Sequence, residues 1–275
     1  MGTELNKVYC MDNLELLKQM DNNSVDLIYC DILYNTGRKF KDYDDNLGTP
    51  QQAMEWYRPR LIEMKRVLKD IGSIYLQCDC RLVHYLKVEM DNIFGIKNFR
   101  NEIIWKYGLG NANSKNRYLT KHDNILFYSK GIDFTFNNIR GEITPQMKAK
   151  YCHEDEIGKY MISKGKKYYL KGGKKIEDVI EVPNMSSTSK ERVGYSTQKP
   201  KELLEILIKQ SSNEGDVVAD FFMGSGTSMV VAKELFRNYI GCDINQRAVD
   251  ITNKRLEVVG KYKGDFKQRR RLTYV

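Results

Sequence analysis

The sequence predicts an α/β fold, in which a mostly parallel sheet carries helices on both faces. Segments with strand patterns alternate with segments with helix patterns along much of the 275-residue chain, and repeated strand–helix units build parallel sheets. Residues 25–30 form a continuous apolar run of strand length, as expected for a strand buried on both faces. The length suits one large domain, or one domain with an insertion.

The first part of the chain supplies most of these elements. We expect strands over residues 7–10, 25–30, 73–76, 102–105 and 124–128, and helices over residues 12–20, 53–68 and 82–94. The helix at 53–68 has apolar residues at helical spacing and ends before Gly72. These elements form one half of the predicted domain, residues 1–130.

The strand–helix alternation is lost at residues 131–195. This stretch contains Gly172-Gly173, lysine clusters and a serine- and threonine-rich run at residues 186–189, which together predict an insertion, part loop and part small subdomain. Order resumes in residues 196–260, with helices expected at 203–208, 227–236 and 248–258 and strands at 216–219 and 239–242. A basic tail follows at residues 261–275.

The formal net charge of +9 is unevenly distributed. Residues 1–96 and 201–260 are net −3 and −2, whereas residues 97–200 and 261–275 are net +9 and +5. Blocks of one sign indicate a polyanionic partner. Two tyrosines lie among the lysines at residues 164–171, which favours nucleic acid over a merely solvated lysine-rich surface. The candidate contacts are Lys115, Arg117, Lys164, Lys166 and Lys167.

Composition excludes several other classes. No run of about 18 apolar residues is available for a membrane span, and the first residues lack the apolar stretch of a signal peptide. Most of the six cysteines lie in apolar runs, so we expect buried free thiols and a reduced, cytoplasmic protein. Cys78-Asp79-Cys80 has the wrong spacing for a zinc knuckle, and no metal site is expected.

A glycine turn lies between the strand at 216–219 and the helix that follows. It reads Asp220-Phe221-Phe222-Met223-Gly224-Ser225-Gly226-Thr227, and glycine allows a ligand to approach the backbone closely. Asp243 ends the next strand, where a carboxylate can bind both ribose hydroxyls of an adenosine-type cofactor. Met229 stands where a dinucleotide fingerprint requires Gly or Ala, and no P-loop Lys follows. S-adenosylmethionine (AdoMet) remains, with a purely structural turn as the alternative.

A second motif, Asp31-Ile32-Leu33-Tyr34, follows the buried strand at 25–30. Ligand sites of open α/β sheets lie at the carboxyl ends of strands. A carboxylate and backbone carbonyls accept hydrogen bonds from an exocyclic amino group, and an aromatic ring can stack on an extruded base. The segment therefore suits methylation of an amino group on a base.

These motifs resemble those of the β-class DNA amino-methyltransferases. That family has Asp-Pro-Pro-Tyr where this chain has residues 31–34, and it follows the motif with an Asn-Thr-Gly like that at 35–37. Its cofactor loop Asp-Pro-Phe-x-Gly-Ser-Gly-Thr is similar to residues 220–227, and its Thr-Gln-Lys-Pro to residues 197–200. The three motifs occur in the family order within residues 7–258.

The resemblance implies a Rossmann-like AdoMet-dependent methyltransferase fold with a seven-stranded sheet and a permuted order, the catalytic motif preceding the cofactor loop. Residues 131–195 then become the target-recognition insertion. Asp31 accepts the target amino group, and Tyr34 stacks on the flipped base. The implied cofactor residues are Asp12, Lys199, Asp220, Phe222, Gly224, Ser225, Gly226, Thr227 and Asp243.

Within that set, Asp243 is expected at the ribose, and Thr227 and Lys199 at the methionine carboxylate. Asp12 is expected on the adenine side, or alternatively as a helix N-cap.

The chain departs from the family at Ile32 and Leu33, which replace two prolines. Their backbone carbonyls survive the change, but the fixed φ of proline is lost, so we expect a less preorganised loop. Phe221 also replaces a proline, with a mild effect expected. His122 and Asp123 suggest acid–base work, but a local structural histidine is favoured because this reaction needs no imidazole.

The leading hypothesis is methylation of adenine N6 in double-stranded DNA, because the family associates Asp at the first motif position with adenine. Methylation of cytosine N4 is the nearest alternative. Ile32 and Leu33 motivate a third, a catalytically silent DNA-binding subunit. The resemblance is also compatible with a homodimer and with a cognate restriction endonuclease.

Overall fold

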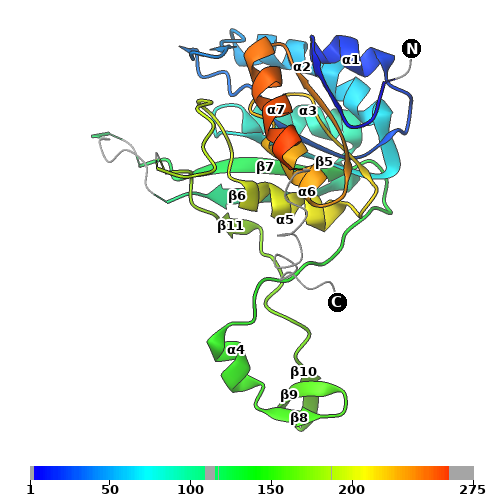
Figure 1. The fold of residues 1–275 in the computed structure, drawn as a ribbon, viewed down its shortest axis with the longest axis vertical. Coiled ribbons are helices and arrows are strands. Elements are labelled where there is room, and N and C mark those ends of the chain that lie inside the picture. The colour runs from blue at the N-terminus through cyan, green and yellow to red at the C-terminus, as the bar shows by residue number, and fades with distance from the viewer. Residues whose placement is uncertain (1–2, 109–114, 117, 187, 260–275) are drawn as a thin grey trace. The chain divides into compact units, whose positions relative to one another are not determined.

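An eight-stranded sheet forms the core of the larger of two units in the computed structural model, which describes residues 3–108, 115–116, 118–186 and 188–259 (Figure 1). The strand order is β1-β13-β12-β2-β5-β7-β6-β11. The strands are β1 (Lys7–Cys10), β2 (Val25–Asp31), β5 (Leu68–Cys78), β6 (Phe99–Lys106), β7 (His122–Ser129), β11 (Val179–Glu181), β12 (Val217–Asp220) and β13 (Asn238–Asp243). The predicted α/β class is confirmed.

The expected number of seven strands is one too few. All seven predicted strands are present, and β11 adds an eighth from within residues 131–195 by pairing in parallel with β6, Val179 opposite Ile104. A strand of three residues is too short to show a periodic pattern, so only its pairing with β6 reveals it.

One strand runs against the others in a way that matters for the site. Strands β1, β13, β12, β2 and β5 pair in parallel, whereas β7 is antiparallel to both β5 and β6. The first residues of β7 therefore lie at the edge where the parallel strands end. In the register, Asn124 stands opposite Cys78, the last residue of β5.

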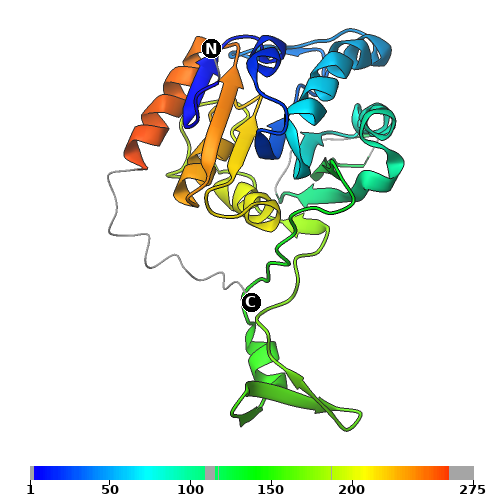
Figure 2. The ribbon, with the colours of Figure 1, turned by 90° about the vertical axis from the view of Figure 1, so that its right-hand side faces the viewer.

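Helices cover both faces of the sheet (Figures 1 and 2). One layer contains α1 (Asn13–Gln19), α2 (Pro50–Val67) and α3 (Val83–Phe94), and the other contains α5 (Lys201–Ser211), α6 (Thr227–Glu234) and α7 (Gln246–Val258). Leu17, Ile28 and Leu61 are fully buried between sheet and helices, and each such side chain contributes about 1.5–3 kcal/mol to folding. Helix α6 ends two residues before its predicted end, where Phe236 has a φ of 61°.

The described residues from 137 to 177 form a separate compact unit. It contains α4 (Pro145–Lys150) and an antiparallel sheet of β8 (His153–Asp155), β9 (Gly158–Ser163) and β10 (Lys166–Tyr169). Lys164 and Gly165 have φ angles of 48° and 73° and form the turn between β9 and β10. A bridge between Arg140 and Lys175 joins the two ends of the unit. The other unit contains the eight-stranded sheet and includes residues 178–195.

Two compositional predictions have structural counterparts. Among the described residues, every helix is too short or too polar to cross a bilayer. Cys30, Cys78 and Cys242 are buried free thiols as predicted, but Cys10, Cys80 and Cys152 are exposed. Cys80 is exposed because it follows the end of β5 rather than lying within the sheet.

Candidate active site

The carboxyl edge of the sheet carries a cavity of about 660 Å³. Asp31, Asp220 and Asp243 end strands β2, β12 and β13, and all three line this cavity. Parallel strands bring their carboxyl ends to one edge, so residues far apart in sequence meet there. The predicted catalytic motif and the predicted glycine loop therefore border one space.

Asp31 is largely buried, with a side chain that is 18% exposed, and has partners on both oxygens. The Lys199 ammonium lies 2.5 Å from Oδ2, and the Tyr34 hydroxyl donates to Oδ1 at 2.8 Å. Burial raises the pKa of Asp31, while the charge of Lys199 and both hydrogen bonds act in the opposite direction. Lys199 also lies 5.5 Å from the centre of the Tyr34 ring. Lys199 thus joins the glycine-loop half of the domain to the catalytic motif.

Hydrogen bonds fix the loop at Ile32 and Leu33. The Ile32 N–H donates to the Gln77 carbonyl at 3.2 Å, a bond that proline could not make, and the Ile32 side chain is buried. The Tyr57 hydroxyl, from α2, donates to the Leu33 carbonyl at 2.8 Å. Among the described residues, the Ile32 carbonyl accepts no hydrogen bond. The loop is thus restrained without prolines and keeps one carbonyl for a ligand.

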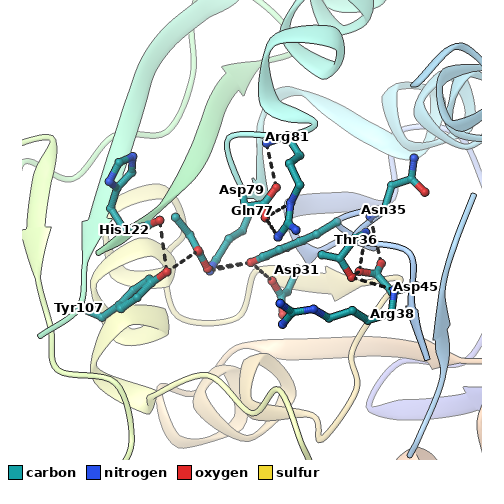
Figure 3. Close-up of polar contacts among 12 residues, drawn as sticks. Asp31, Asn35, Thr36, Arg38, Asp45, Gln77, Asp79, Arg81, Tyr107 and His122 are labelled. Atoms are coloured by element: carbon teal, nitrogen blue, oxygen red, sulfur yellow. Dashed lines mark hydrogen bonds and ion pairs between the residues drawn. The ribbon is translucent and has the colours of Figure 1, made fainter. Parts of the chain in front are cut away.

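Asp123, which the sequence analysis named with His122 but did not include among the site residues, lies at the site. It is 7% exposed, lines the cavity and lies at the start of β7. Its Oδ2 accepts hydrogen bonds from the Tyr34 hydroxyl at 2.9 Å and from Gln77 Nε2 at 3.1 Å, and its Oδ1 accepts one from Tyr107 at 3.2 Å. Figure 3 shows Asp31, Gln77 and Tyr107 converging on this network. In the sequence, Asp123 is an acidic residue at the start of a strand. That position indicates a site only if the strand is antiparallel to its neighbours, because its start then lies at the edge where the parallel strands end.

His122, in contrast, contributes its backbone carbonyl, which accepts a hydrogen bond from Tyr107 at 3.3 Å. That contact fits the structural role favoured for this histidine.

The glycine loop is shaped by two carboxylates. Asp243 accepts the Gly224 N–H at 3.0 Å on Oδ2 and the Asn245 N–H at 2.8 Å on Oδ1. Asp220 accepts the Phe222 N–H at 3.0 Å and the Ser228 hydroxyl, and burial raises its pKa to about 7. Both carboxylates therefore hold the loop and also face the cavity.

Gly226 is required by its surroundings, since it has a φ of 70° and a Cβ there would lie 2.3 Å from the Thr252 side chain. Ser225 and Thr227 are tied to α7, because Arg255 donates to the Ser225 carbonyl at 2.7 Å and to Thr227 Oγ1 at 3.0 Å. The Phe222 ring lies 6.1 Å from that of Trp56 and forms an apolar wall of the cavity.

Asp12 is a helix N-cap, as one of its two interpretations proposed. Its Oδ1 accepts the Leu14 N–H at 2.8 Å, and its Oδ2 pairs with Arg60 at 2.8 Å. It also lines the cavity, so the adenine-side role stays a prediction.

The segment that follows the catalytic motif crosses to the glycine-loop half of the domain. It contains the short hairpin of β3 (Arg38–Lys39) and β4 (Asp44–Asp45). Asp45 accepts the N–H groups of Asn35 and Thr36, both at 3.0 Å (Figure 3). Asp42 pairs with Arg247 of α7 and accepts the Ser196 hydroxyl at 3.1 Å. These contacts hold this segment beside the cavity.

The predicted nucleic-acid contacts have different surroundings. Lys115, Lys164 and Lys166 are exposed. Lys167 pairs with Asp155 at 2.7 Å and lies 4.4 Å from the centre of the Tyr160 ring, so its charge is partly compensated within its own unit. Arg117 and the basic tail lie outside the described residues.

Comparisons with known proteins agree with this geometry. A family model described as DNA methylase matches residues 25–254. The Type II methyltransferase M.HpaI of Haemophilus parainfluenzae is 34% identical over 256 residues, covering 91% of this chain and 74% of the relative. The DNA adenine methyltransferase YhdJ of Escherichia coli (strain K12) is 29% identical over 265 residues, covering 96% of this chain and 87% of the relative.

Solved structures show the same fold. PvuII DNA methyltransferase (cytosine-N4-specific) aligns with a TM-score of 0.65 at 16% identity, covering 97% of this chain and 94% of that one. The M1.HpyAVI–SAM complex aligns with a TM-score of 0.58 at 20% identity, covering 93% of this chain and all of that one. These likenesses confirm the predicted methyltransferase fold.

Proposed function

Because the chain belongs to the DNA methylase family, whose members modify the exocyclic amino groups of bases, we propose that it transfers a methyl group from AdoMet to the N6 amino group of adenine in a short DNA sequence. The observation that carries the proposal is the shared cavity, where Asp31 and its loop face the glycine loop and Asp243. The target base is flipped out of the duplex to reach it.

The residues at the glycine loop fit AdoMet. Each oxygen of Asp243 accepts one backbone N–H and retains capacity for another donor, as two ribose hydroxyls require. Gly224 keeps the loop open beside Tyr195, since a Cβ there would lie 3.1 Å from the Tyr195 ring. The start of α6 at Thr227 offers backbone N–H groups to the methionine carboxylate. Lys199, held at Asp31, is a second candidate for that carboxylate.

When bound, AdoMet supplies an electrophilic methyl group on a sulfonium. The work of the protein is then to position the amino nitrogen. Asp31 and the carbonyl of Ile32 accept its two N–H bonds, which directs the nitrogen lone pair toward the methyl group. Tyr34 stacks its ring on the base. Placement in a buried, preorganised site supplies most of the acceleration.

Asp31 favours adenine over cytosine, given the family association of Asp with N6 methylation. The adenine enzyme of E. coli, related over nearly the whole chain, supports the same choice. Cytosine N4 remains the second candidate, because PvuII DNA methyltransferase shares the fold.

The unit of residues 137–177 is assigned to DNA recognition. Its exposed Lys164 lies in the turn between β9 and β10, and its exposed Lys166 begins β10 near Tyr168 and Tyr169. Such a surface suits contacts with phosphates and bases. Lys115 is assigned to the same partner. By analogy with the Type II relative, we expect a restriction–modification role in the cytoplasm, beside a cognate endonuclease.

The test is methyl transfer from labelled AdoMet to duplex DNA of mixed sequence, followed by nucleoside analysis. Labelled N6-methyladenine is expected. Labelled N4-methylcytosine would replace the adenine assignment, and no label would favour the silent subunit. Asp31→Ala should abolish transfer while AdoMet still binds; full activity in that variant would refute the role of Asp31.

A further inference from the structure

The Tyr34 hydroxyl lies between two carboxylates. It is 2.8 Å from Asp31 Oδ1 and 2.9 Å from Asp123 Oδ2. A phenol has a single proton, so it can donate to only one of the two at a time. Two carboxylates on one hydroxyl, one buried and one largely buried, form a path along which a proton can move.

The surroundings give this path a direction. Asp31 is held by the Lys199 ammonium at 2.5 Å, which stabilises its ionised form. The donors that the structure gives Asp123 are neutral: the Gln77 amide, the Tyr34 hydroxyl and the Tyr107 hydroxyl. The charge of Lys199 therefore opposes a proton on Asp31, whereas these three donors place no positive charge beside Asp123.

Gln77 keeps the path in place. Its Oε1 accepts the Tyr29 hydroxyl at 2.7 Å, so its Nε2 must face the other way, toward Asp123 at 3.1 Å and the Tyr34 oxygen at 3.3 Å. Tyr29 and Gln77 are both buried. The two ends of the path are thus held at a fixed separation before any substrate binds.

We propose that Asp123 is the terminal proton acceptor of methyl transfer, reached from Asp31 through the Tyr34 hydroxyl. The proposal rests on the proposed function, in which the target nitrogen loses one proton as it gains a methyl group. The N–H bond breaks and the proton binds Asp31. It then passes to the Tyr34 oxygen as the phenol proton passes to Asp123 Oδ2. Asp31 returns to its ion pair with Lys199, and one new O–H bond remains on Asp123.

The two transfers at Tyr34 occur together. Burial beside two carboxylates raises the pKa of Tyr34 well above its usual range, so a free phenolate is not formed. Tyr107 is only partly buried and bonds to Asp123 Oδ1, which gives the proton a way out after turnover.

The experiment compares Asp123→Asn, Tyr34→Phe and the double variant in the full chain. Asn keeps an acceptor oxygen for Tyr34 but cannot take up a proton, and Phe keeps the ring for stacking. Asp26→Asn is the matched control, because Asp26 is a buried carboxylate at the other end of β2, paired with Lys69. Single-turnover methyl transfer is measured in H₂O and in H₂O–D₂O mixtures, with AdoMet affinity by calorimetry.

We expect each single variant to slow transfer at least about tenfold, at the low end for acid–base catalysis, with AdoMet affinity within about twofold of the wild type. The double variant should be no slower than the slower single one, since both changes break one path. The wild-type rate should curve with deuterium content, and the Tyr34→Phe rate should vary linearly.

Additive losses, or an Asp123→Asn rate within about twofold of that of Asp26→Asn, would overturn the relay. If the wild type labels no DNA, the proposed function itself fails; if it labels DNA and Asp123→Asn labels equally fast, only the relay fails.

Discussion

Tyr57→Phe tests whether hydrogen bonds preorganise the Ile32–Leu33 loop. The variant keeps a ring that is 1% exposed and that packs 5.0 Å from the Trp56 ring, but it deletes the hydroxyl that donates to the Leu33 carbonyl at 2.8 Å. An unpaired buried carbonyl costs about 1–3 kcal/mol. If the cost falls on the transition state, the rate drops about 5- to 150-fold.

The assay is steady-state methyl transfer with kcat and KM for AdoMet and for DNA, together with thermal unfolding. We expect kcat to fall by about fivefold or more, with KM for AdoMet nearly unchanged, because Tyr57 holds the catalytic loop and not the glycine loop. An unchanged kcat would refute the reasoning, whatever the effect on stability.

Two proline variants provide the matched comparison. Among the described residues the Leu33 N–H makes no hydrogen bond, so Leu33→Pro should restore part of the rate in the Tyr57→Phe background by fixing φ. Ile32→Pro removes the bond from the Ile32 N–H to the Gln77 carbonyl and should lower the rate. Equal effects of the two prolines would contradict this account of the loop.

Three further outcomes are expected. Asp243→Ala should weaken AdoMet binding at least about tenfold in calorimetry, because hydrogen bonds to a charged group contribute about 1.5–3 kcal/mol each; unchanged affinity would remove Asp243 from the site. Lys199→Met should move the acidic limb of the kcat/KM profile to higher pH, since the ammonium lowers the pKa of Asp31 and the carboxylate is the active form; an unmoved limb would contradict that coupling. Asp220 has a pKa raised from 3.8 to about 7, so its stabilisation is present below pH 3.8 and is lost as the pH rises through about 7. In urea unfolding, the free energy of unfolding of the wild type relative to that of Asp220→Asn should therefore fall by about 4 kcal/mol between pH 3.8 and about pH 7. A difference that stays constant over this range would contradict the raised pKa of Asp220.

The sequence predicted those elements of the fold that have a clear periodic pattern or a continuous apolar run. The apolar run ending in Asp31 marks the central strand, and the glycine turn before Thr227 marks the start of α6. The strand at 73–76 is longer than predicted, because β5 begins at Leu68 directly after α2 and includes the polar residues Lys69 and Asp70. Leu68 pairs with Val25 of β2, but pairing with β2 resumes, and pairing with β7 begins, only at Ser73, so no local pattern marks the residues between.

The site was predicted only in part, because tertiary pairing decides it. Asp31 and the glycine loop are readable from motifs, but nothing local shows that Lys199 pairs with Asp31. Asp123 was named with His122 as a sign of acid–base work, but its place at the cavity could not be predicted because the direction of β7 is set by its partners in the sheet. Residues 35–48 carried no strand signal, since their hairpin has only two residues in each strand.

The bridge between Arg140 and Lys175 makes the unit of residues 137–177 exchangeable. Its chain leaves and returns at one point, where Gly173 packs so tightly against the Gly141 carbonyl that a Cβ would come within 2.1 Å. Everything between these positions can be lengthened, shortened or replaced without rerouting a strand of the large sheet. With DNA recognition assigned to this unit as proposed above, we expect that a lineage can change its target by exchanging one short gene segment while the proposed site at Asp31 and Asp243 stays the same.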